Sequence, residues 1–495
     1  MGTEKANLVR QIAEAFAFFI LRMYISRKMW EYSGKQITLL SIRIINRYPK
    51  GVIMKVLKIL FFCLLLPVAV IAADVPRLKL VVTSDIHGQW KILEKVYAFA
   101  AGKNPDAVLF CGDLAIRHGD ANSYKTYISL FKKHFSKSNK MPAHIVIPGN
   151  HDFWAPKGQK RLSAQKSAER FFGTMGMKNE WLRHTEVNGY SIIAVSATDE
   201  KGENSHTPAE IKQVSDLIGK AEKAAPGKPV FVLSHCPPAF TMSGSSWKKK
   251  SPKSRGWYWR YDLIREMLKG HKQAVSLSGH THVTLHDERA IWQGDFTAIS
   301  AGVLPHAGFV MAGQNARPFQ PRVRSNRYAG AFIYIEVFDK YMLVYRYNAT
   351  NMKEIKAENR WRIDLPYDPA KAVYTDKRFK ESTAPHFPAG AKAEIVCVKG
   401  RYYLRLDRAE HADMVYSYKV NLSFDDKKIK AQTFYLISDF VLPRKSKRAL
   451  LEIPAAVKLQ AGAAGTMEIS PVESFGKHGK SITAKFVIPA VKTKK

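Results

Sequence analysis

In residues 78–88, LKLVVTSDIHG, a short apolar run passes directly into polar residues and a glycine. Residues 78–83 are rich in Leu and Val, which is typical of a strand buried on both faces of a sheet. Asp85 and His87 follow, two positions apart, and in an extended backbone such residues point the same way. The stretch therefore predicts a buried strand that delivers a carboxylate and an imidazole to one pocket.

The same alternation of elements continues along the chain. Residues 207–210, Thr-Pro-Ala-Glu, are typical of a capped helix start, and a hairpin over residues 332–347 is expected to close the region. Strands that alternate with helices predict an α/β domain. The strand-like runs are residues 107–111, 144–147, 191–196, 229–233 and 274–277, and helical spacing occupies residues 90–101, 123–135, 161–172, 209–224 and 262–268.

Residue types that bind metals follow these strands. In open α/β sheets, functional sites lie at the carboxyl ends of the strands. Sites with both oxygen and nitrogen ligands bind Zn, Mn or Fe. A single member such as His235 would more often be a histidine of the core or the surface. The whole ordered set predicts a metal centre. Its members are Asp85 and His87, then Asp113, then Asn150, His151 and Asp152, then His235, and finally His280 and His282.

In this order the residues resemble the signature of the calcineurin-like metallophosphoesterases: Asp-x-His, Gly-Asp, Gly-Asn-His-Asp/Glu, a lone His after a strand, and Gly-His-x-His. The resemblance spans roughly residues 78–350. It implies an exported bacterial member with a metallophosphoesterase-type four-layer α/β sandwich, in which two mixed β-sheets are flanked by helices. It also implies two divalent metal ions, Mn, Zn or Fe. Asp85, His87 and His282 would hold one ion, Asn150, His235 and His280 the other, and Asp113 would bridge them.

The resemblance also implies catalytic roles for His151 and Asp152. His151 resembles the family's non-ligand histidine, which stabilises phosphoryl oxygens or protonates the leaving alkoxide. Asp152 would orient His151 or, as an equal alternative, cap the turn in which it stands. Purple acid phosphatases carry a charge-transfer tyrosine three residues after the bridging aspartate. Because Ile116 stands there in this chain, a purple iron(III) site is disfavoured.

The segment between His235 and His280 is rich in basic and aromatic residues. Since it leaves a ligand-bearing loop, it is expected either to overhang the site, where cations would meet phosphate, or to form a solvated loop. The partner is a small or polymeric phosphate ester, with nucleic acid entering only as a substrate, and monoester and diester are not distinguished. The candidate substrate contacts are Arg255, Trp257 and Arg260 in this segment, with Arg117 and His118 after Asp113.

The two ends of the chain differ in character from the α/β domain over residues 76–350. Beyond a linker at residues 351–388, residues 389–495 contain short strand-like runs without helices, which predicts a small all-β sandwich domain similar to a fibronectin type III module. Residues 54–73 have the basic, apolar and small-residue pattern of a secretory signal peptide. Their apolar run of about 15 residues is shorter than a spanning helix of roughly 20. Residues 1–53 would then be an over-called extension.

The amino-acid composition limits the classes of protein to which the chain can belong. The 78 Lys and Arg residues against 42 Asp and Glu residues give a net charge of +36, which predicts anionic partners. The 46% hydrophobic content excludes collagen-like, coiled-coil and wholly disordered chains. The leading interpretation is a periplasmic or secreted metal-dependent phosphoesterase, with a signal-anchored membrane form as the minor alternative. The alternative function is a metal-stabilised binding protein that recognises an anionic envelope polymer through its C-terminal domain.

Overall fold

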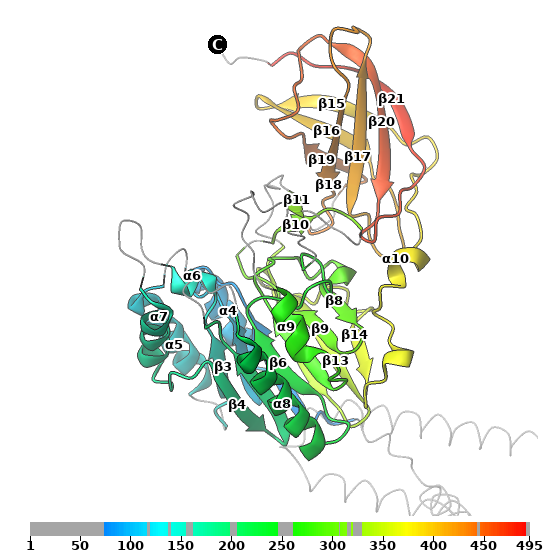
Figure 1. The fold of residues 1–495 in the computed structure, drawn as a ribbon. Helices are drawn as coiled ribbons and strands as arrows, with labels where there is room; N and C mark the ends of the chain where they lie inside the picture. The colour runs from blue at the N-terminus through cyan, green and yellow to red at the C-terminus, as the bar shows by residue number, and fades with distance from the viewer. Residues whose placement is uncertain are drawn as a thin grey trace, which may run out of the picture. The chain divides into compact units, whose positions relative to one another are not determined.

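The computed structural model describes residues 74–495, with the exception of residues 116–118, 137–139, 155–161, 199–204, 246–260, 306, 314–317, 320–328, 443–445 and 492–495. The chain divides into two units, and the second, Pro76–Lys495, is the subject of the description below (Figure 1). The expected extension 1–53 and signal peptide 54–73 lie outside the described residues. In the part of the chain that is described, none of the helices has both the length and the apolar character needed to cross a membrane.

The first sheet has six strands in the order β14-β13-β12-β1-β2-β3. Strands β1, β2 and β3 run parallel, and β12 pairs antiparallel with β1 and begins an antiparallel meander. The predicted hairpin is confirmed as β12 and β13, and the expected linker contributes β14 to the sheet. The strands are β1 (Leu78–Thr83), β2 (Ala107–Cys111), β3 (Ala143–Ile147), β12 (Ala331–Val337), β13 (Tyr341–Asn348) and β14 (Trp361–Asp364).

The second sheet also has six strands, in the order β4-β5-β6-β7-β9-β8. Its central strands β5, β6, β7 and β9 are parallel, whereas β4 and β8 are antiparallel edges. Both sheets are therefore mixed. The strands are β4 (Leu182–Val187), β5 (Tyr190–Val195), β6 (Val230–Ser234), β7 (Ala274–Ser278), β8 (Ile291–Gln293) and β9 (Thr297–Ser300).

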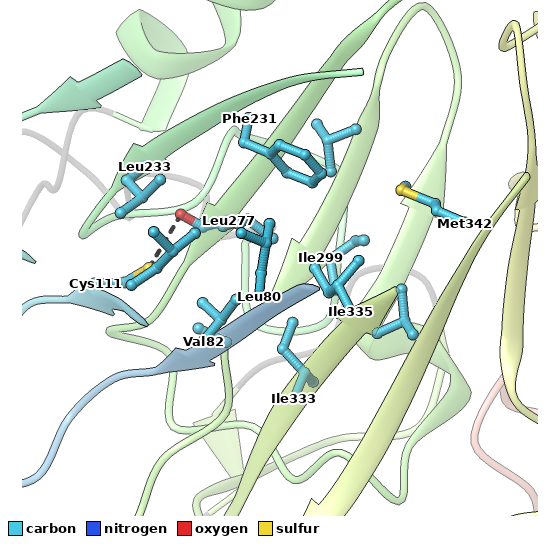
Figure 2. Close-up of a cluster of buried hydrophobic side chains, with 14 of the residues drawn as sticks. Leu80, Val82, Cys111, Phe231, Leu233, Leu277, Ile299, Ile333, Ile335 and Met342 are labelled. Atoms are coloured by element: carbon cyan, nitrogen blue, oxygen red, sulfur yellow. Dashed lines mark hydrogen bonds between the residues drawn. The ribbon is translucent and has the colours of Figure 1, made fainter. Parts of the chain in front are cut away.

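The two sheets face each other across one apolar core. Leu80 and Val82 of β1 belong to the same buried cluster as Leu233 of β6 and Leu277 of β7, and Figure 2 shows these side chains together. The Sγ atom of Cys111 donates a hydrogen bond to the Leu277 carbonyl at 3.6 Å and joins the sheets directly. Burial of the apolar runs on both faces explains why these strands lack a polar alternation.

Helices cover the outer face of each sheet. Val81 of β1 points away from Leu80 and packs with Tyr97 and Tyr127 of the first helical layer, while Val232 of β6 packs with Ile218 of the second. The four-layer α/β sandwich expected from the sequence is thereby confirmed. The helices are α4 (Trp90–Ala101), α5 (Ala121–Phe135), α6 (Asn150–Phe153) and α7 (Ala164–Met175) beside the first sheet, and α8 (Pro208–Ala224) and α9 (Tyr261–Leu268) on the second.

Local signals set several helix ends. The predicted start of α8 is confirmed, because the Thr207 side chain accepts from the Glu210 N–H at 3.2 Å while the Glu210 carboxylate accepts from the Thr207 N–H at 2.6 Å. Helix α7 begins at a Ser163 cap and ends at Gly176 in the left-handed conformation, at φ 69°. The starts of α7 and α8 and the end of α7 are therefore set by residues whose side chains or backbone satisfy terminal hydrogen bonds.

The C-terminal region is all-β, as predicted. A three-stranded sheet of order β15-β16-β19 and a four-stranded sheet of order β18-β17-β20-β21 enclose one core, in which Leu404 and Leu406 of the first sheet meet Val420 and Leu422 of the second. The strands are β15 (Ala393–Val398), β16 (Arg401–Asp407), β17 (Ser417–Phe424), β18 (Gln432–Ile437), β19 (Arg448–Glu452), β20 (Ala464–Val472) and β21 (Ile482–Val487).

Short elements join these parts. The 3-10 helix η1 follows β7, and the two-stranded ribbon of β10 and β11 lies between β9 and β12 (Figure 1). Two further short helices, η3 and α10, lie between β14 and β15. The bounds are η1 (Glu288–Ala290), β10 (Phe309–Val310), β11 (Pro318–Phe319), η3 (Pro369–Lys371) and α10 (Arg378–Glu381).

Candidate metal centre

All seven candidate metal ligands stand directly after strands of the two facing sheets. In the first sheet β1 leads into two of them, β2 into one and β3 into one; in the second sheet β6 leads into one and β7 into two. The facing sheets bring the loops together, so residues far apart in sequence share one site. The residues are Asp85 and His87 after β1, Asp113 after β2, Asn150 after β3, His235 after β6, and His280 and His282 after β7.

The first group of donors consists of Asp85, His87, Asp113 and His282, whose ligand atoms all lie within 4.8 Å of one another. The Nε2 atom of His282 lies 2.9 Å from Asp85 Oδ1 and 3.0 Å from His87 Nε2. Asp85 is 0% and Asp113 1% exposed, so water does not solvate these carboxylates. Two buried carboxylates and two imidazoles at this spacing could hold a metal ion.

The second group gathers around Asn150. Its Oδ1 atom lies 3.0 Å from both His235 Nε2 and His280 Nδ1, and these two ring nitrogens are 3.2 Å apart. An amide oxygen and two imidazole nitrogens are again metal-ligand types. Asp113 Oδ2 faces both groups, at 3.8 Å from His87 Nε2 and 3.4 Å from His235 Nε2. One carboxylate oxygen therefore stands between the two sets of donors.

The backbone that aims these side chains is strained. Five ligand residues have a backbone in the left-handed region, which residues with a Cβ atom rarely adopt. Their φ angles are 51° for Asp85, 46° for His87, 61° for Asp113, 66° for His280 and 53° for His282. The expectation that Asp85 and His87 share a side because the backbone is extended there was wrong; a left-handed turn brings them together. Strain of this kind persists where the surrounding structure enforces it and is concentrated at functional sites.

Glycine allows the loops to approach each other. Gly112 has φ 97°, and a Cβ atom at this position would lie 2.5 Å from His235 Nδ1 and 2.8 Å from the Gly149 nitrogen. Only a residue without a side chain therefore fits between the loops after β2, β3 and β6. This close packing fixes the separation between Asp113 and the second donor group.

Hydrogen bonds to the backbone orient the ligands. His235 Nδ1 donates to the Cys111 carbonyl at 2.7 Å, which leaves Nε2 as the nitrogen that faces the other donors. The His280 N–H donates to Asp85 Oδ2 at 2.9 Å, and the His151 N–H donates to Asp113 Oδ1 at 2.8 Å. Each carboxylate thus has one oxygen held by the backbone and the other turned toward the imidazoles.

Electrostatics favour ionised carboxylates in the cluster. Burial by itself would raise the pKa of Asp85, but the charge and hydrogen bond of His282 outweigh burial and hold that pKa well below its usual range. Burial also opposes ionisation of Asp113, yet the charge of His235 lowers its pKa. Burial lowers the pKa of His235, but the charge of Asp113 raises it to about 9. Buried ionised carboxylates require compensating positive charge, which the His235 imidazolium supplies in the metal-free protein and which a divalent cation would supply in its place.

Comparison with known proteins agrees with this chemistry. Residues 78–284 match the family model described as calcineurin-like phosphoesterase. They form a calcineurin-like phosphoesterase domain. The chain matches no curated protein.

Solved structures similar to the chain include several phosphoesterases. A predicted phosphoesterase of Streptococcus pneumoniae TIGR4 is 14% identical, with 58% of this chain and 97% of that chain covered and a TM-score of 0.28. A purple acid phosphatase from yellow lupin, Lupinus luteus, is 13% identical, with coverage of 59% and 55% and a TM-score of 0.38. The phosphoesterase Yfce of E. coli is 11% identical, with coverage of 57% and 98% and a TM-score of 0.26.

In the phosphoesterase domain His151 stands beside the ligands. Its ring lies 4.1 Å from the Trp154 ring and meets the His87 ring edge-on at 4.8 Å. Its Nδ1 atom is buried and has no hydrogen-bond partner among the described residues. Burial lowers the pKa of His151 to about 4, against the pull of Asp113, so the imidazole is neutral at neutral pH. Sequence reasoning missed Trp154; an aromatic residue so soon after a candidate catalytic histidine was the available signal.

Asp152 contacts the backbone on both sides of the centre. Its carboxylate accepts from the N–H groups of Gly149 at 2.9 Å, Asp113 at 3.0 Å, Leu114 at 3.3 Å and Ala115 at 3.2 Å. Of the two roles expected for Asp152, these bonds favour the turn-capping one, extended to the neighbouring loop. Asp152 therefore ties the loop of Asp113 to the loop of Asn150.

The candidate substrate contacts Arg117, His118, Arg255, Trp257 and Arg260 lie outside the described residues. At the described boundary of that segment, Tyr261 is buried and its ring meets the His280 ring edge-on at 6.0 Å. The sequence did not single out Tyr261 as a site residue, because an aromatic residue is equally expected at the apolar start of α9.

Proposed function

We propose that the chain is a metal-dependent phosphoesterase that hydrolyses a phosphate ester at a centre of two divalent metal ions. The observation that carries the proposal is the position of Asp113, whose Oδ2 atom lies within 4 Å of an imidazole nitrogen of each donor group. A carboxylate that contacts two sets of ligands suits a bridge between neighbouring cations. The match of residues 78–284 to the phosphoesterase family supports the same reaction class.

Each ion would have its own ligands. Asp113 would serve both, and Mn, Zn or Fe suit this mixture of carboxylate, amide and imidazole donors. When bound, two such ions lower the pKa of a shared water and offset charge on the attacking and leaving oxygens of a phosphoryl displacement. One ion would be held by Asp85, His87 and His282, and the other by Asn150, His235 and His280.

The protein supplies position and hydrogen bonds. His151, with its buried Nδ1 atom unpartnered among the described residues, is placed to donate a hydrogen bond from its neutral imidazole to a phosphoryl oxygen. Trp154 packs against the His151 ring at an interplanar angle of 35°, and the His151 backbone N–H donates to Asp113. The proposal covers monoesters and diesters alike.

Substitutions separate metal binding from turnover. Asp113→Asn or His235→Ala should lose metal and abolish hydrolysis, whereas His151→Ala should keep metal but lose turnover, measured by metal analysis and release of p-nitrophenol. Matched controls are Asp339→Asn, on a 66% exposed carboxylate, and His386→Ala, on a 69% exposed imidazole; both should behave as the unchanged protein. A fully active His151→Ala protein, or an unchanged protein that is active in strong chelator, refutes the mechanism.

The same assay addresses the alternative function. A metal-stabilised binding protein would retain metal yet hydrolyse neither p-nitrophenyl phosphate nor its bis ester with Mn or Zn. If either ester is hydrolysed, a phosphate-release screen against nucleotides, phospholipid headgroups and cell-envelope fragments would identify the substrate class.

We also propose that the protein is exported, on the strength of the signal-like pattern at residues 54–73. Mass spectrometry of the native protein tests this. A mature N-terminus near Asp74 is expected, and an N-terminus elsewhere would contradict cleavage of a signal peptide. Peptides from residues 1–53 would contradict the prediction that translation begins at Met54.

A further inference from the structure

The segment between β9 and β12 lies along the metal centre. The Gly308 N–H donates to the His282 carbonyl at 2.5 Å, and Gly308 forms a β-bridge with Val283. The Leu304 N–H donates to the Asp85 carbonyl at 3.4 Å. The backbone of two residues of the first donor group is therefore held by this segment.

The same segment is bound from its other side by the C-terminal β-sandwich. The Tyr416 hydroxyl donates to the Val310 carbonyl at 2.8 Å and lies 3.3 Å from the Val310 nitrogen, whose N–H it accepts. Tyr416 is 0% exposed. Its own backbone is fixed in the sandwich, because its N–H donates to the Val472 carbonyl and its carbonyl accepts from the Ser438 N–H, both at 2.9 Å.

Apolar contacts surround this hydroxyl. Phe309 packs edge-on against Phe440 with ring centroids 5.9 Å apart, and Phe440 stacks on Tyr416 at 5.5 Å. Val303 and Ala307 of the segment belong to the same buried cluster. The contact is therefore dry, and a hydrogen bond that is lost there is not replaced by water.

Arg289 adds a second connection. Its guanidinium lies over the Tyr416 ring at 4.9 Å and donates to the carbonyls of Met311 at 2.9 Å and Gly313 at 3.1 Å. Asp287 holds the guanidinium with bonds of 3.0 and 2.7 Å, and both side chains are buried. The Gly313 N–H donates to the Ser474 carbonyl of the sandwich at 2.9 Å. Residues 310–313 are thus anchored at both ends.

We propose that the C-terminal β-sandwich is a structural part of the metal centre and that Tyr416 is its positioning residue. By fixing Val310, the hydroxyl keeps Gly308 bonded to the His282 carbonyl and so holds the His282 imidazole in place. Since β10 is only two residues long, it has little pairing of its own to resist displacement. The inference rests on the proposed function only in that metal binding and turnover are two of its readouts.

The test compares Tyr416→Phe with Tyr418→Phe in the full protein. Both changes delete one buried hydroxyl two residues apart, but Tyr418 accepts from the Ala409 N–H at 3.2 Å inside the sandwich. Tyr416→Phe should bind Mn²⁺ about tenfold more weakly by calorimetry, as expected for loss of an outer support, and lose turnover that excess Mn²⁺ restores. Tyr418→Phe should retain both properties.

Hydrogen–deuterium exchange of the metal-free protein gives a readout independent of activity. Tyr416→Phe should accelerate exchange in the peptide 280–285, and Tyr418→Phe should not. Equal behaviour of the two variants in affinity and exchange overturns the inference. If the unchanged protein binds no Mn²⁺ and cleaves no ester, the proposed function fails, and exchange alone then decides the positioning role. If Tyr416→Phe does not fold, Arg289→Lys replaces it in the test. A lysine cannot bond the carbonyls of both Met311 and Gly313, so this variant is expected to show the same changes in affinity and exchange. Unaltered affinity and exchange in Arg289→Lys would overturn the inference.

Discussion

Replacing Asp152 by asparagine changes one atom at the point where the loops of the two donor groups meet. The carboxylate is 1% exposed and accepts four backbone N–H bonds, three through Oδ2 and one, from Ala115, through Oδ1. The best that an amide can do is to place its oxygen at the Oδ2 position. Its NH₂ group then faces the Ala115 N–H, so two donors oppose each other.

The cost follows from the hydrogen bonds. One buried N–H without an acceptor costs about 1–3 kcal/mol. The three remaining bonds weaken when the charge is lost, but burial and the charge of Asp113 raise the pKa of Asp152 to about 6, so removal of the carboxylate also relieves a penalty and the unpaired N–H sets the cost. We therefore expect Asp152→Asn to lower the free energy of unfolding by about 1–3 kcal/mol. Since Asp113 and Asn150 lie on the loops joined by Asp152, metal affinity should fall as well, although Asp152 is not a proposed ligand.

Urea unfolding of the metal-free protein measures the first effect, and calorimetric Mn²⁺ binding the second. Asp120→Asn is the matched control, because Asp120 caps α5 by accepting from the Ser123 N–H at 2.8 Å and asparagine caps helices equally well. The control should differ from the unchanged protein by less than about 0.5 kcal/mol. If Asp152→Asn has the same stability and Mn²⁺ affinity as the control, Asp152 does not join the two loops as described.

Two further predictions concern packing and pH. Gly112→Ala should abolish metal binding and reduce stability, since its Cβ would lie 2.5 Å from His235 Nδ1; unaltered metal content would contradict this. Glu288 bonds Arg346 and Trp361, and although burial opposes ionisation, the charge of Arg346 lowers its pKa to about 2. Because the unfolded chain takes up the proton first as pH falls, the unchanged protein should lose about 2 kcal/mol relative to Glu288→Gln between pH 7 and 3, by urea unfolding. Parallel pH profiles would contradict this.

The strands that carry the site could be predicted because they are buried on both faces. A run such as residues 78–83 has few alternatives to a central strand, and the polar residues that follow must then stand at the edge of the sheet. The position of β14 was harder to predict from the sequence, because Trp361–Asp364 alternates buried and exposed residues over only four positions. Its pairing with β13 depends on contacts across the sheet rather than on local pattern.

The geometry of the centre could be predicted only in outline. Residue types and order brought Asp85, His87 and Asp113 together, but the left-handed backbone that aims them is imposed by surrounding loops and leaves no mark on those residues themselves. The bond between Tyr416 and Val310 joins residues 106 positions apart and involves a backbone group, so no pattern of side chains reveals it. The proposed role of the C-terminal region could therefore be inferred only from the structure.

The proposal of a two-metal phosphoesterase is tested by titrating the metal-free protein with Mn²⁺. Bound metal and hydrolysis of p-nitrophenyl phosphate and its bis ester are followed together. Two ions bridged by Asp113 predict that hydrolysis of at least one ester rises with metal and saturates at about two equivalents for each chain, and that Asp113→Asn removes both binding and hydrolysis. Failure to hydrolyse either ester at any loading of Mn²⁺ or Zn²⁺, with the metal nevertheless bound, would contradict the claim.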